Sequence, residues 1–237
     1  MQLLVSVRDA EEAGLALRAG AHILDAKEPA EGPLAPVRPE VLAAISRVLP
    51  PATPLSVALG EPRDVPALTR LLSERRGALS GRPAFVKFVM PTRAPDVLTA
   101  CVAAARAGAP GARVVLAAYA DRTDVALVEL AALAAQAGAD GVLLDTAGKG
   151  RSLLDVVPIE ALAAVVAGGH ARGLFVALAG SLRADDLPRV AALGADVAGV
   201  RGAACDGGRS GALSPQRVRA LRLATERGRR AHAVPSW

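Results

Sequence analysis

Short apolar runs alternate with longer amphipathic segments from one end of the chain to the other. Each apolar run has five to seven residues, mainly Val, Leu and Ala, which is typical of parallel strands buried on both faces. Capping residues open the amphipathic segments and glycines end them, as at Asp9 and Gly20 of the first one. The pattern predicts eight strands at residues 3–7, 22–26, 55–59, 84–90, 114–119, 141–145, 174–179 and 197–201.

The amphipathic segments predict helices after these strands, at residues 9–20, 39–48, 64–77, 95–108, 123–137, 158–173, 183–193 and from 214 onward. Eight strand–helix units in 237 residues favour a single α/β domain, a (β/α)₈ TIM barrel over residues 1–237 with a frayed tail after about residue 230. A doubly wound open sheet is the alternative. It does not need eight units, and residues 7–10 lack the glycine-rich turn expected after its first strand.

Lysine is unusually scarce in this chain. Of the 28 basic residues only three are lysine, and all three lie at or just beyond the predicted end of a strand: Lys27, Lys87 and Lys149. Arginine stays charged, whereas a partly buried lysine can lose its proton and attack a carbonyl carbon. Chance placement is the alternative, but the shared position at strand ends favours chemistry.

Alternate side chains of a barrel strand point inward, so each strand predicts which residues face the interior. The inward sets are Ile23, Asp25 and Lys27 on the second strand, Phe85, Lys87 and Val89 on the fourth, and Leu143 and Asp145 on the sixth. Side chains from alternate strands share a layer in a barrel. The residues of the second, fourth and sixth strands should therefore converge, namely Asp25, Lys27, Lys87, Asp145 and Lys149. The eighth strand is expected to contribute Arg201 to the same layer. A purely structural salt-bridge cluster is the alternative, although buried ion pairs stabilise less than apolar packing.

Two loops of small residues predict a phosphate site. Gly180 and Ser181 follow the seventh strand, and Gly202 and Ala203 follow Arg201 at the end of the eighth. In many barrels these two loops bind phosphate through exposed backbone N–H groups. The glycine-rich residues 207–211 are either a mobile flap or a long turn. Tyr119, the only tyrosine, is either an aid to proton transfer or an aromatic at the core edge.

Several classes of function find no support in the sequence. The net charge of +5 is spread along the chain, and residues 217–230 suit a solvated helix face, so we expect no nucleic-acid partner. No apolar run approaches the roughly 18 to 20 residues of a membrane span, and the start of the chain lacks a signal-peptide pattern. Cys101, Cys205 and the three histidines form no metal motif, so we expect a cytoplasmic chain with no metal and no cofactor.

These motifs resemble those of the (5-formylfuran-3-yl)methyl phosphate synthase family, which begins the furan moiety of methanofuran. The resemblance runs from residue 3 to about residue 221 and is carried by residues 25–27, 85–87, 144–149, 177–181 and 199–205. It implies a (β/α)₈ barrel that condenses two glyceraldehyde 3-phosphate molecules with loss of phosphate and water. It also implies that Lys27 forms a Schiff base and that Lys87, Asp25, Asp145 and Lys149 match other active-site positions. The loop at residues 60–64 is shorter and more charged than its archaeal counterpart.

The chemistry of these residues suits such a reaction independently of the resemblance. An amine at Lys27 can convert a triose-phosphate carbonyl to an iminium, and either Asp145 or Asp25 is placed to move the proton from the adjacent carbon. Lys87 and Lys149 can stabilise oxyanions and lower the pKa of Lys27. The expected partner is a small phosphorylated substrate, and the chain is expected to form a homo-oligomer. Other Schiff-base aldolases or lyases, a pyridoxal-phosphate barrel and a non-catalytic phosphate-binding barrel remain alternatives.

Overall fold

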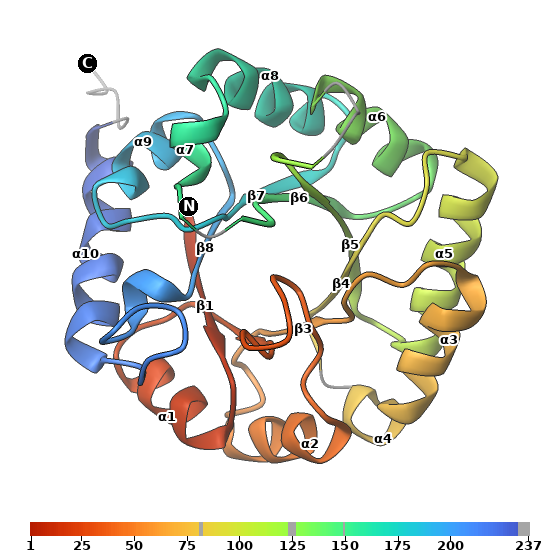
Figure 1. Ribbon diagram of the computed structural model, residues 1–237, viewed down its shortest axis with the longest axis horizontal. Helices are drawn as coiled ribbons and strands as arrows, with labels where there is room; N and C mark the ends of the chain where they lie inside the picture. The colour runs from red at the N-terminus through yellow and green to blue at the C-terminus, as the bar shows by residue number, and fades with distance from the viewer. Residues whose placement is uncertain (81–82, 123–126, 149, 232–237) are drawn as a thin grey trace.

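A closed barrel of eight parallel strands forms the centre of the molecule, in the order in which the strands occur along the chain (Figure 1). The computed structural model describes residues 1–80, 83–122, 127–148 and 150–231. The strands are β1 Gln2–Val7, β2 Ile23–Ala26, β3 Leu55–Ala58, β4 Phe85–Val89, β5 Arg113–Tyr119, β6 Gly141–Asp145, β7 Phe175–Leu178 and β8 Val197–Val200. The predicted (β/α)₈ barrel is therefore confirmed, with strand ends shifted by at most one residue.

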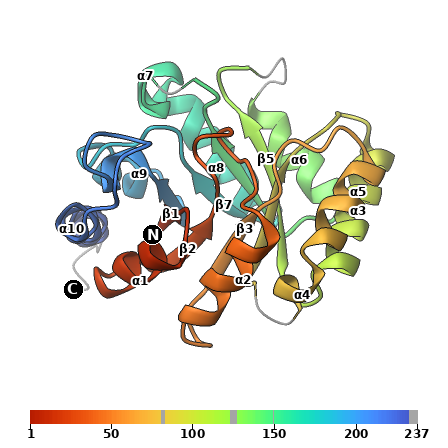
Figure 2. The same ribbon diagram turned by 60° about the horizontal axis from the view of Figure 1, so that its bottom comes forward.

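An outer ring of helices surrounds the barrel, and the short helix α7 lies above this ring in the side view (Figure 2). The main helices are α1 Ala10–Arg18, α2 Pro39–Val48, α3 Val65–Glu74, α5 Pro95–Gly108, α6 Leu127–Gln136, α8 Ile159–His170, α9 Asp186–Ala192 and α10 Pro215–Ala231. Three short elements were not predicted: α4 Arg76–Leu79, α7 Leu153–Val156 and the 3₁₀ turn η1 Gly202–Ala204. Residue 123, the predicted cap of α6, and residues 232–237 of the predicted tail lie outside the described residues.

Local capping explains where two of the outer helices begin. The Asp9 carboxylate accepts a hydrogen bond from the Glu12 backbone N–H at 2.8 Å, and Asp64 accepts one from the Ala67 N–H at 2.7 Å. Each bond satisfies a donor that has no partner within the first turn of a helix. These aspartates therefore mark the points where the chain leaves a strand-end loop and turns back along the barrel.

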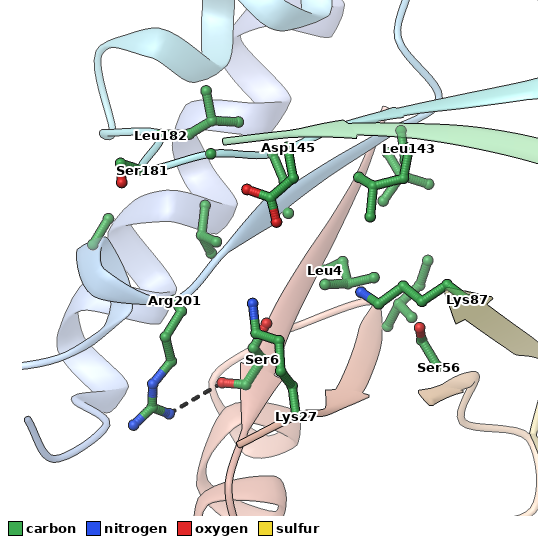
Figure 3. A pocket seen from close by; sticks show the side chains of 18 of the residues that line it. Leu4, Ser6, Lys27, Ser56, Lys87, Leu143, Asp145, Ser181, Leu182 and Arg201 are labelled. Carbon is green, nitrogen blue, oxygen red and sulfur yellow. Dashed lines mark hydrogen bonds between the residues drawn. The ribbon is translucent and has the colours of Figure 1, made fainter. Parts of the chain in front are cut away.

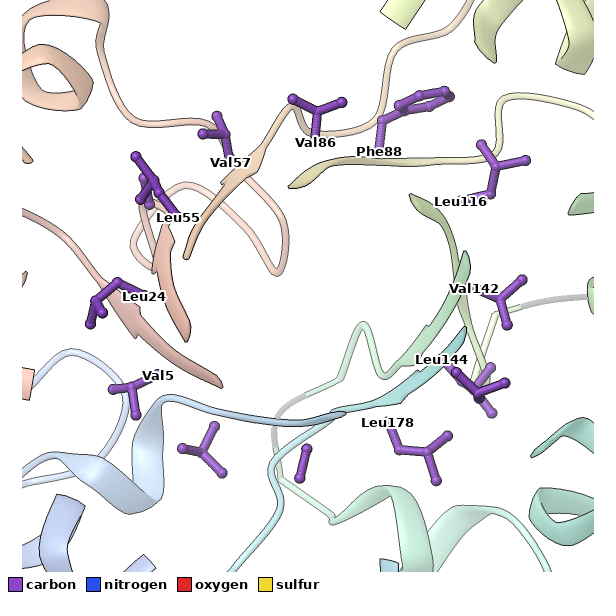
Figure 4. Close-up of a cluster of buried hydrophobic side chains, with 14 of the residues drawn as sticks. Val5, Leu24, Leu55, Val57, Val86, Phe88, Leu116, Val142, Leu144 and Leu178 are labelled. Atoms are coloured by element: carbon purple, nitrogen blue, oxygen red, sulfur yellow. The ribbon is translucent and has the colours of Figure 1, made fainter. Parts of the chain in front are cut away.

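The main hydrophobic core lies between the barrel and the helices (Figure 4). Outward-facing strand residues such as Val5, Leu24, Val86 and Leu116 have no exposed surface. A second, smaller cluster fills some of the interior with Ile23, Leu143 and other inward residues. Because both faces of every strand are covered, the strands read as continuous apolar runs rather than as alternating ones. Among the described residues no helix has the length and apolar character needed to cross a membrane.

An aromatic pair lies at the N-terminal ends of β4 and β7. The rings of Phe85 and Phe175 meet edge to face, with centroids 5.5 Å apart and planes at 70°. The Arg113 guanidinium lies 5.5 Å from the Phe175 ring centroid. Gly141 leaves room for this pair, because a Cβ atom at that position would lie 2.6 Å from two atoms of the Phe175 ring. The pair forms the floor of the barrel interior, since both rings also line the cavity described below.

We expect Gly141→Ala to destabilise the protein by about 1–3 kcal/mol, because the added methyl group displaces the Phe175 ring in a closely packed interior. Urea unfolding followed by circular dichroism measures the change. Gly77→Ala is the matched control, since an added Cβ at this exposed position in α4 meets nothing within 4 Å. That control should be neutral or slightly stabilising. Equal stabilities for the two variants would contradict the close packing of Gly141 against the Phe175 ring at the floor of the barrel.

Candidate active site

A cavity of about 280 Å³ occupies the barrel interior and extends to the loops after β7 and β8. The predicted inward residues Ile23 and Lys27, Phe85 and Lys87, and Leu143 and Asp145 all line it, which confirms the register predicted for these three strands. Figure 3 shows the amino groups of Lys27 and Lys87 pointing into the space below Asp145. The site thus lies at the carboxyl ends of the strands, where barrel enzymes place their chemistry.

Asp25 anchors the polar layer from within the barrel wall. Its side chain has no exposed surface; Oδ1 lies 2.9 Å from the Lys87 Nζ, and Oδ2 accepts a hydrogen bond from the Ser6 hydroxyl at 3.0 Å. Burial alone would raise the pKa of Asp25, but the charges of Lys87 and Lys27 outweigh it and hold this pKa below its ordinary value. Asp25 is therefore a fixed anion paired with Lys87.

Lys27 and Asp145 stand at the ends of facing strands. Lys27 follows the last residue of β2 and is 8% exposed, and its backbone N–H donates to the Val7 carbonyl at 3.1 Å. Asp145 ends β6 and is 2% exposed, and its carboxylate accepts a hydrogen bond from the Thr146 N–H at 2.7 Å. Both side chains line the cavity, so a small molecule bound there touches an amine and a carboxylate together.

The fifth predicted residue, Lys149, lies outside the described residues. The loop leading to it is held by Asp121, a residue that sequence reasoning did not single out. Asp121 accepts hydrogen bonds at 2.7 Å from the backbone N–H groups of both Ala147 and Gly148. An aspartate two residues beyond a strand carries no distinctive sequence signal, because its partners come from the next strand-end loop.

The two predicted phosphate loops line the same cavity. Gly180 has φ +103° and Ser181 has φ +49°, so the chain turns sharply after β7. Only glycine suits position 180, because a Cβ there would also lie 2.8 Å from the Thr146 hydroxyl oxygen. Gly202 and Ala203 begin the 3₁₀ turn η1 after β8. Four small residues thus let backbone approach a ligand from one side.

Arg201 lines the cavity, and its side chain is held by contacts that the sequence did not predict. Its guanidinium donates to Glu12 Oε2 at 2.5 Å and to Oε1 at 3.0 Å, and to the carbonyls of Ser6, Arg209 and Gly211, each at 3.1 Å. Every nitrogen of the group is engaged, and Figure 3 shows the side chain directed away from the two lysines. The side chain therefore fastens β1, α1 and the loop after η1 together, and its role in binding phosphate stays a prediction.

Two further residues near the mouth make contacts that the sequence did not predict, Tyr119 and Glu12. The Tyr119 hydroxyl donates to Glu61 Oε1 at 2.9 Å, which ties the end of β5 to the loop after β3. Burial, aided by this bond to a carboxylate, raises the pKa of Tyr119, so the phenol stays neutral. Glu12, which forms the start of α1 together with Asp9, is buried between Arg8 and Arg201. No group of three His, Cys, Asp or Glu side chains suited to a metal occurs among the residues that the structure describes.

Comparison with known sequences identifies the family. A sequence profile of the 4-HFC-P synthase family matches residues 3–222. The chain belongs to this family. It is 38% identical to the (5-formylfuran-3-yl)methyl phosphate synthase of Methanopyrus kandleri, across 93% of this chain and 97% of that protein. It is 37% identical to the enzyme of the same name from Methanocaldococcus jannaschii, across 88% and 92%. The resemblance found in the sequence motifs is thereby confirmed.

Solved structures support the fold of this 4-HFC-P synthase family member. Phosphoribosyl anthranilate isomerase from Thermus thermophilus superposes with a TM-score of 0.67, at 20% identity over 96% of this chain and 99% of that one. The 3-hexulose-6-phosphate synthase of Salmonella typhimurium gives a TM-score of 0.68, at 18% identity over 96% and 100%. At such identities the likeness concerns the barrel alone.

The buried Glu12 predicts how stability depends on pH. Burial raises its pKa, but the hydrogen bonds and charges of Arg201 and Arg8 prevail and place it below the ordinary value. A lowered folded-state pKa contributes stability that is present above the unfolded pKa of about 4.3 and lost as pH falls through the folded value. Glu12→Gln should therefore be less stable than the wild type at pH 7, with the difference shrinking at about pH 3–4.

Urea unfolding at both pH values measures this difference. Glu11→Gln is the control, because Glu11 is exposed on the same helix turn and should change stability little at either pH. If Glu12→Gln lowers the free energy of unfolding by the same amount at acidic pH as at pH 7, the charge of the carboxylate does not stabilise the fold.

Proposed function

We propose that this protein is a (5-formylfuran-3-yl)methyl phosphate synthase, an enzyme that condenses two glyceraldehyde 3-phosphate molecules through a lysine Schiff base. Phosphate and water are lost as the furan ring forms, which makes the enzyme a lyase of methanofuran biosynthesis. The observation that carries the proposal is the meeting of Lys27, Lys87 and Asp145 in one cavity, with Asp25 paired to Lys87 behind it, in a chain that belongs to the synthase family. A cytoplasmic location and a homo-oligomeric state remain predictions.

Lys27 is the proposed nucleophile. Its amine attacks the carbonyl carbon of a triose phosphate, the carbinolamine loses water, and the resulting iminium makes the adjacent C–H acidic. Lys27 must be neutral to attack, and its side chain lines the cavity, where a bound carbonyl carbon can reach the amine. Lys87 is less suited to attack, because its ammonium is already paired with Asp25 at 2.9 Å.

Asp145 is the proposed base that moves the proton from this carbon. The sequence left Asp25 and Asp145 as equal candidates, and their surroundings favour the second. Asp25 is shut off from the cavity with its oxygens taken by Lys87 and Ser6, whereas Asp145 lines the cavity. Proton transfer needs the base within hydrogen-bond reach of the carbon acid, which only a cavity-lining group meets. Asp25 would instead hold Lys87 where an oxyanion develops.

The cavity volume fits a small substrate. Ligand pockets for larger molecules commonly reach about 300–1,000 Å³, and this cavity lies at the lower end of that scale. Its upper side offers the backbone of Gly180, Ser181, Gly202 and Ala203 to a phosphate. The lysine cluster and these loops lie on the same cavity, so a triose can reach Lys27 while its phosphate contacts the loops.

Turnover of glyceraldehyde 3-phosphate alone tests the reaction. We expect a new furan-aldehyde absorption band together with released phosphate. Phosphate release without that band would favour another Schiff-base lyase, and a yellow protein as purified would favour a pyridoxal-phosphate barrel. Phosphate binding with no turnover would favour a non-catalytic phosphate-binding barrel.

Borohydride reduction in the presence of triose phosphate should trap a covalent adduct on a peptide that contains Lys27. Lys27→Arg keeps the charge but cannot form the iminium, so we expect turnover to fall by several orders of magnitude while the fold persists. Peptide mass spectrometry and steady-state kinetics give the two readouts.

Lys87→Arg is the matched comparison, because it preserves a cation beside Asp25. Its turnover should fall by about 10²- to 10³-fold, as for one lost oxyanion donor. An adduct on Lys87 would overturn the choice of nucleophile, and product formation with no adduct on any lysine would overturn the Schiff base itself.

The phosphate loops are tested at Gly202. Gly202→Val should raise the KM by about tenfold or more, equivalent to losing one good contact, while the melting temperature changes little. Gly202 is preferable to Gly180 because a Cβ at 202 meets only ordinary contacts of 3.5 Å or more. A folded variant with the KM of the wild type would remove these loops from the phosphate site.

A further inference from the structure

The loop at residues 206–211, after η1, carries an arginine to the mouth of the cavity. Arg209 and Gly208 both line the cavity, next to the backbone of residues 202 and 203. This closeness is direct, because a Cβ atom added to Gly202 would lie 3.5 Å from the Arg209 backbone nitrogen. The sequence left this loop as either a flap or a long turn. The structure makes it a turn beside the proposed phosphate loops.

Two buried or half-buried arginines fasten this loop. Arg201 donates to the carbonyls of Arg209 and Gly211, and Arg8 donates to the carbonyl of Ser210 at 3.1 Å. Both guanidiniums bond to the same Glu12 carboxylate, which holds them side by side. Three successive carbonyl contacts within residues 209–211 determine where the Arg209 backbone lies.

The loop backbone itself requires glycine at its end. A Cβ at Gly211 would overlap the Asp206 carbonyl, so the two ends of the turn are in direct contact. Asp206 is held in turn by Arg217, whose Nε lies 2.6 Å from the carboxylate. The turn is therefore a built structure with its own contacts at each end.

Arg209 differs from the other arginines around the mouth in what it bonds to. Arg8 and Arg201 pair with Glu12, and Arg183 pairs with Asp155 and Asp186. Within the described residues, Arg209 has no carboxylate within 4 Å, and its Nη2 atom donates to the Gly32 carbonyl at 2.5 Å. Partial burial lowers the pKa of Arg209, because the cation loses water that no anion replaces, although the charge of Asp145 opposes this.

We propose that Arg209 binds a substrate phosphate at the mouth of the cavity, and that Glu12 and Arg201 position it through the loop. The inference rests on the proposed function for the identity of the substrate. A phosphate dianion supplies the missing countercharge, and its oxygens match the planar fork of a guanidinium. The backbone of Gly202 and Ala203 offers N–H donors but no formal charge, so Arg209 adds what those loops lack.

Kinetics of Arg209→Ala test this role. We expect the KM for glyceraldehyde 3-phosphate to rise by about 10- to 100-fold, as for one lost charge-assisted hydrogen bond, with a smaller change in kcat. Arg209→Lys keeps the charge without the fork and should recover some of the loss. Arg172→Ala is the matched control, because it removes one positive charge just beyond the end of α8, where the Arg172 guanidinium donates to the Gly168 carbonyl at 2.9 Å.

Titration of inorganic phosphate by calorimetry separates this inference from the proposed reaction. Arg209→Ala should weaken phosphate binding by a similar factor whether or not the wild type forms a furan. An unchanged KM together with unchanged phosphate affinity would overturn the role of Arg209. A wild type that makes no furan aldehyde but binds phosphate through Arg209 would overturn the reaction and leave this inference standing.

A double-mutant cycle tests the positioning by Arg201. Arg201→Lys should raise the KM in the wild-type background and cause no further rise in Arg209→Ala, because both changes remove the same contact. If Arg201→Lys does not fold, Arg8→Ala takes its place, since Arg8 is partly exposed and still bonds the loop at Ser210. Fully additive effects on the KM in both cycles would show that Arg201 and Arg8 do not act through Arg209.

Discussion

The burial of the Asp25 carboxylate is the constraint on which the active-site layer depends. An ionised group without solvent is tolerated only where opposite charge and hydrogen bonds replace the water. Lys87 supplies the charge from β4 and Ser6 supplies a hydrogen bond from β1, so three strands must hold their register for the charge to stay satisfied. In the mechanism we propose, this pairing gives Lys87 an electrostatic role and leaves Lys27, just beyond the end of β2, as the better placed nucleophile.

A second buried carboxylate, Glu12, organises the mouth of the barrel in a similar way. Glu12 lies in the first turn of α1, but its two oxygens gather Arg8 and Arg201, and these arginines hold the loop that carries Arg209. Breaking one partner of such a network leaves an uncompensated buried charge, which costs more than the network contributes when whole. The mouth of the barrel is therefore shaped by the ion pair between Arg201, which follows β8, and Glu12 of α1, which lies far along the chain from the loop itself.

The sequence was sufficient wherever the deciding signal was local. Strand alternation has a period of two, so the inward direction of Lys27, Lys87 and Asp145 follows from the strand boundaries alone. It was insufficient where a side chain chooses among distant partners. Arg201 ends its strand as a phosphate ligand would, yet Glu12, 189 positions away, takes its guanidinium. Pairings such as this one, or Tyr119 with Glu61, leave no pattern in either segment.

The hollow interior is the last feature that the proposed chemistry needs. Barrel interiors are usually filled by layers of large side chains, but here Ser6, Ser56, Ala177 and Gly199 line the cavity and leave space above the Phe85–Phe175 floor. Small interior residues forgo dispersion contacts, and the dense apolar layer between strands and helices compensates for the loss. The cavity walls below the lysines are largely apolar, so water has few partners there. A dehydrating condensation gains from such a lining, because expelled water is not held at the reacting carbons.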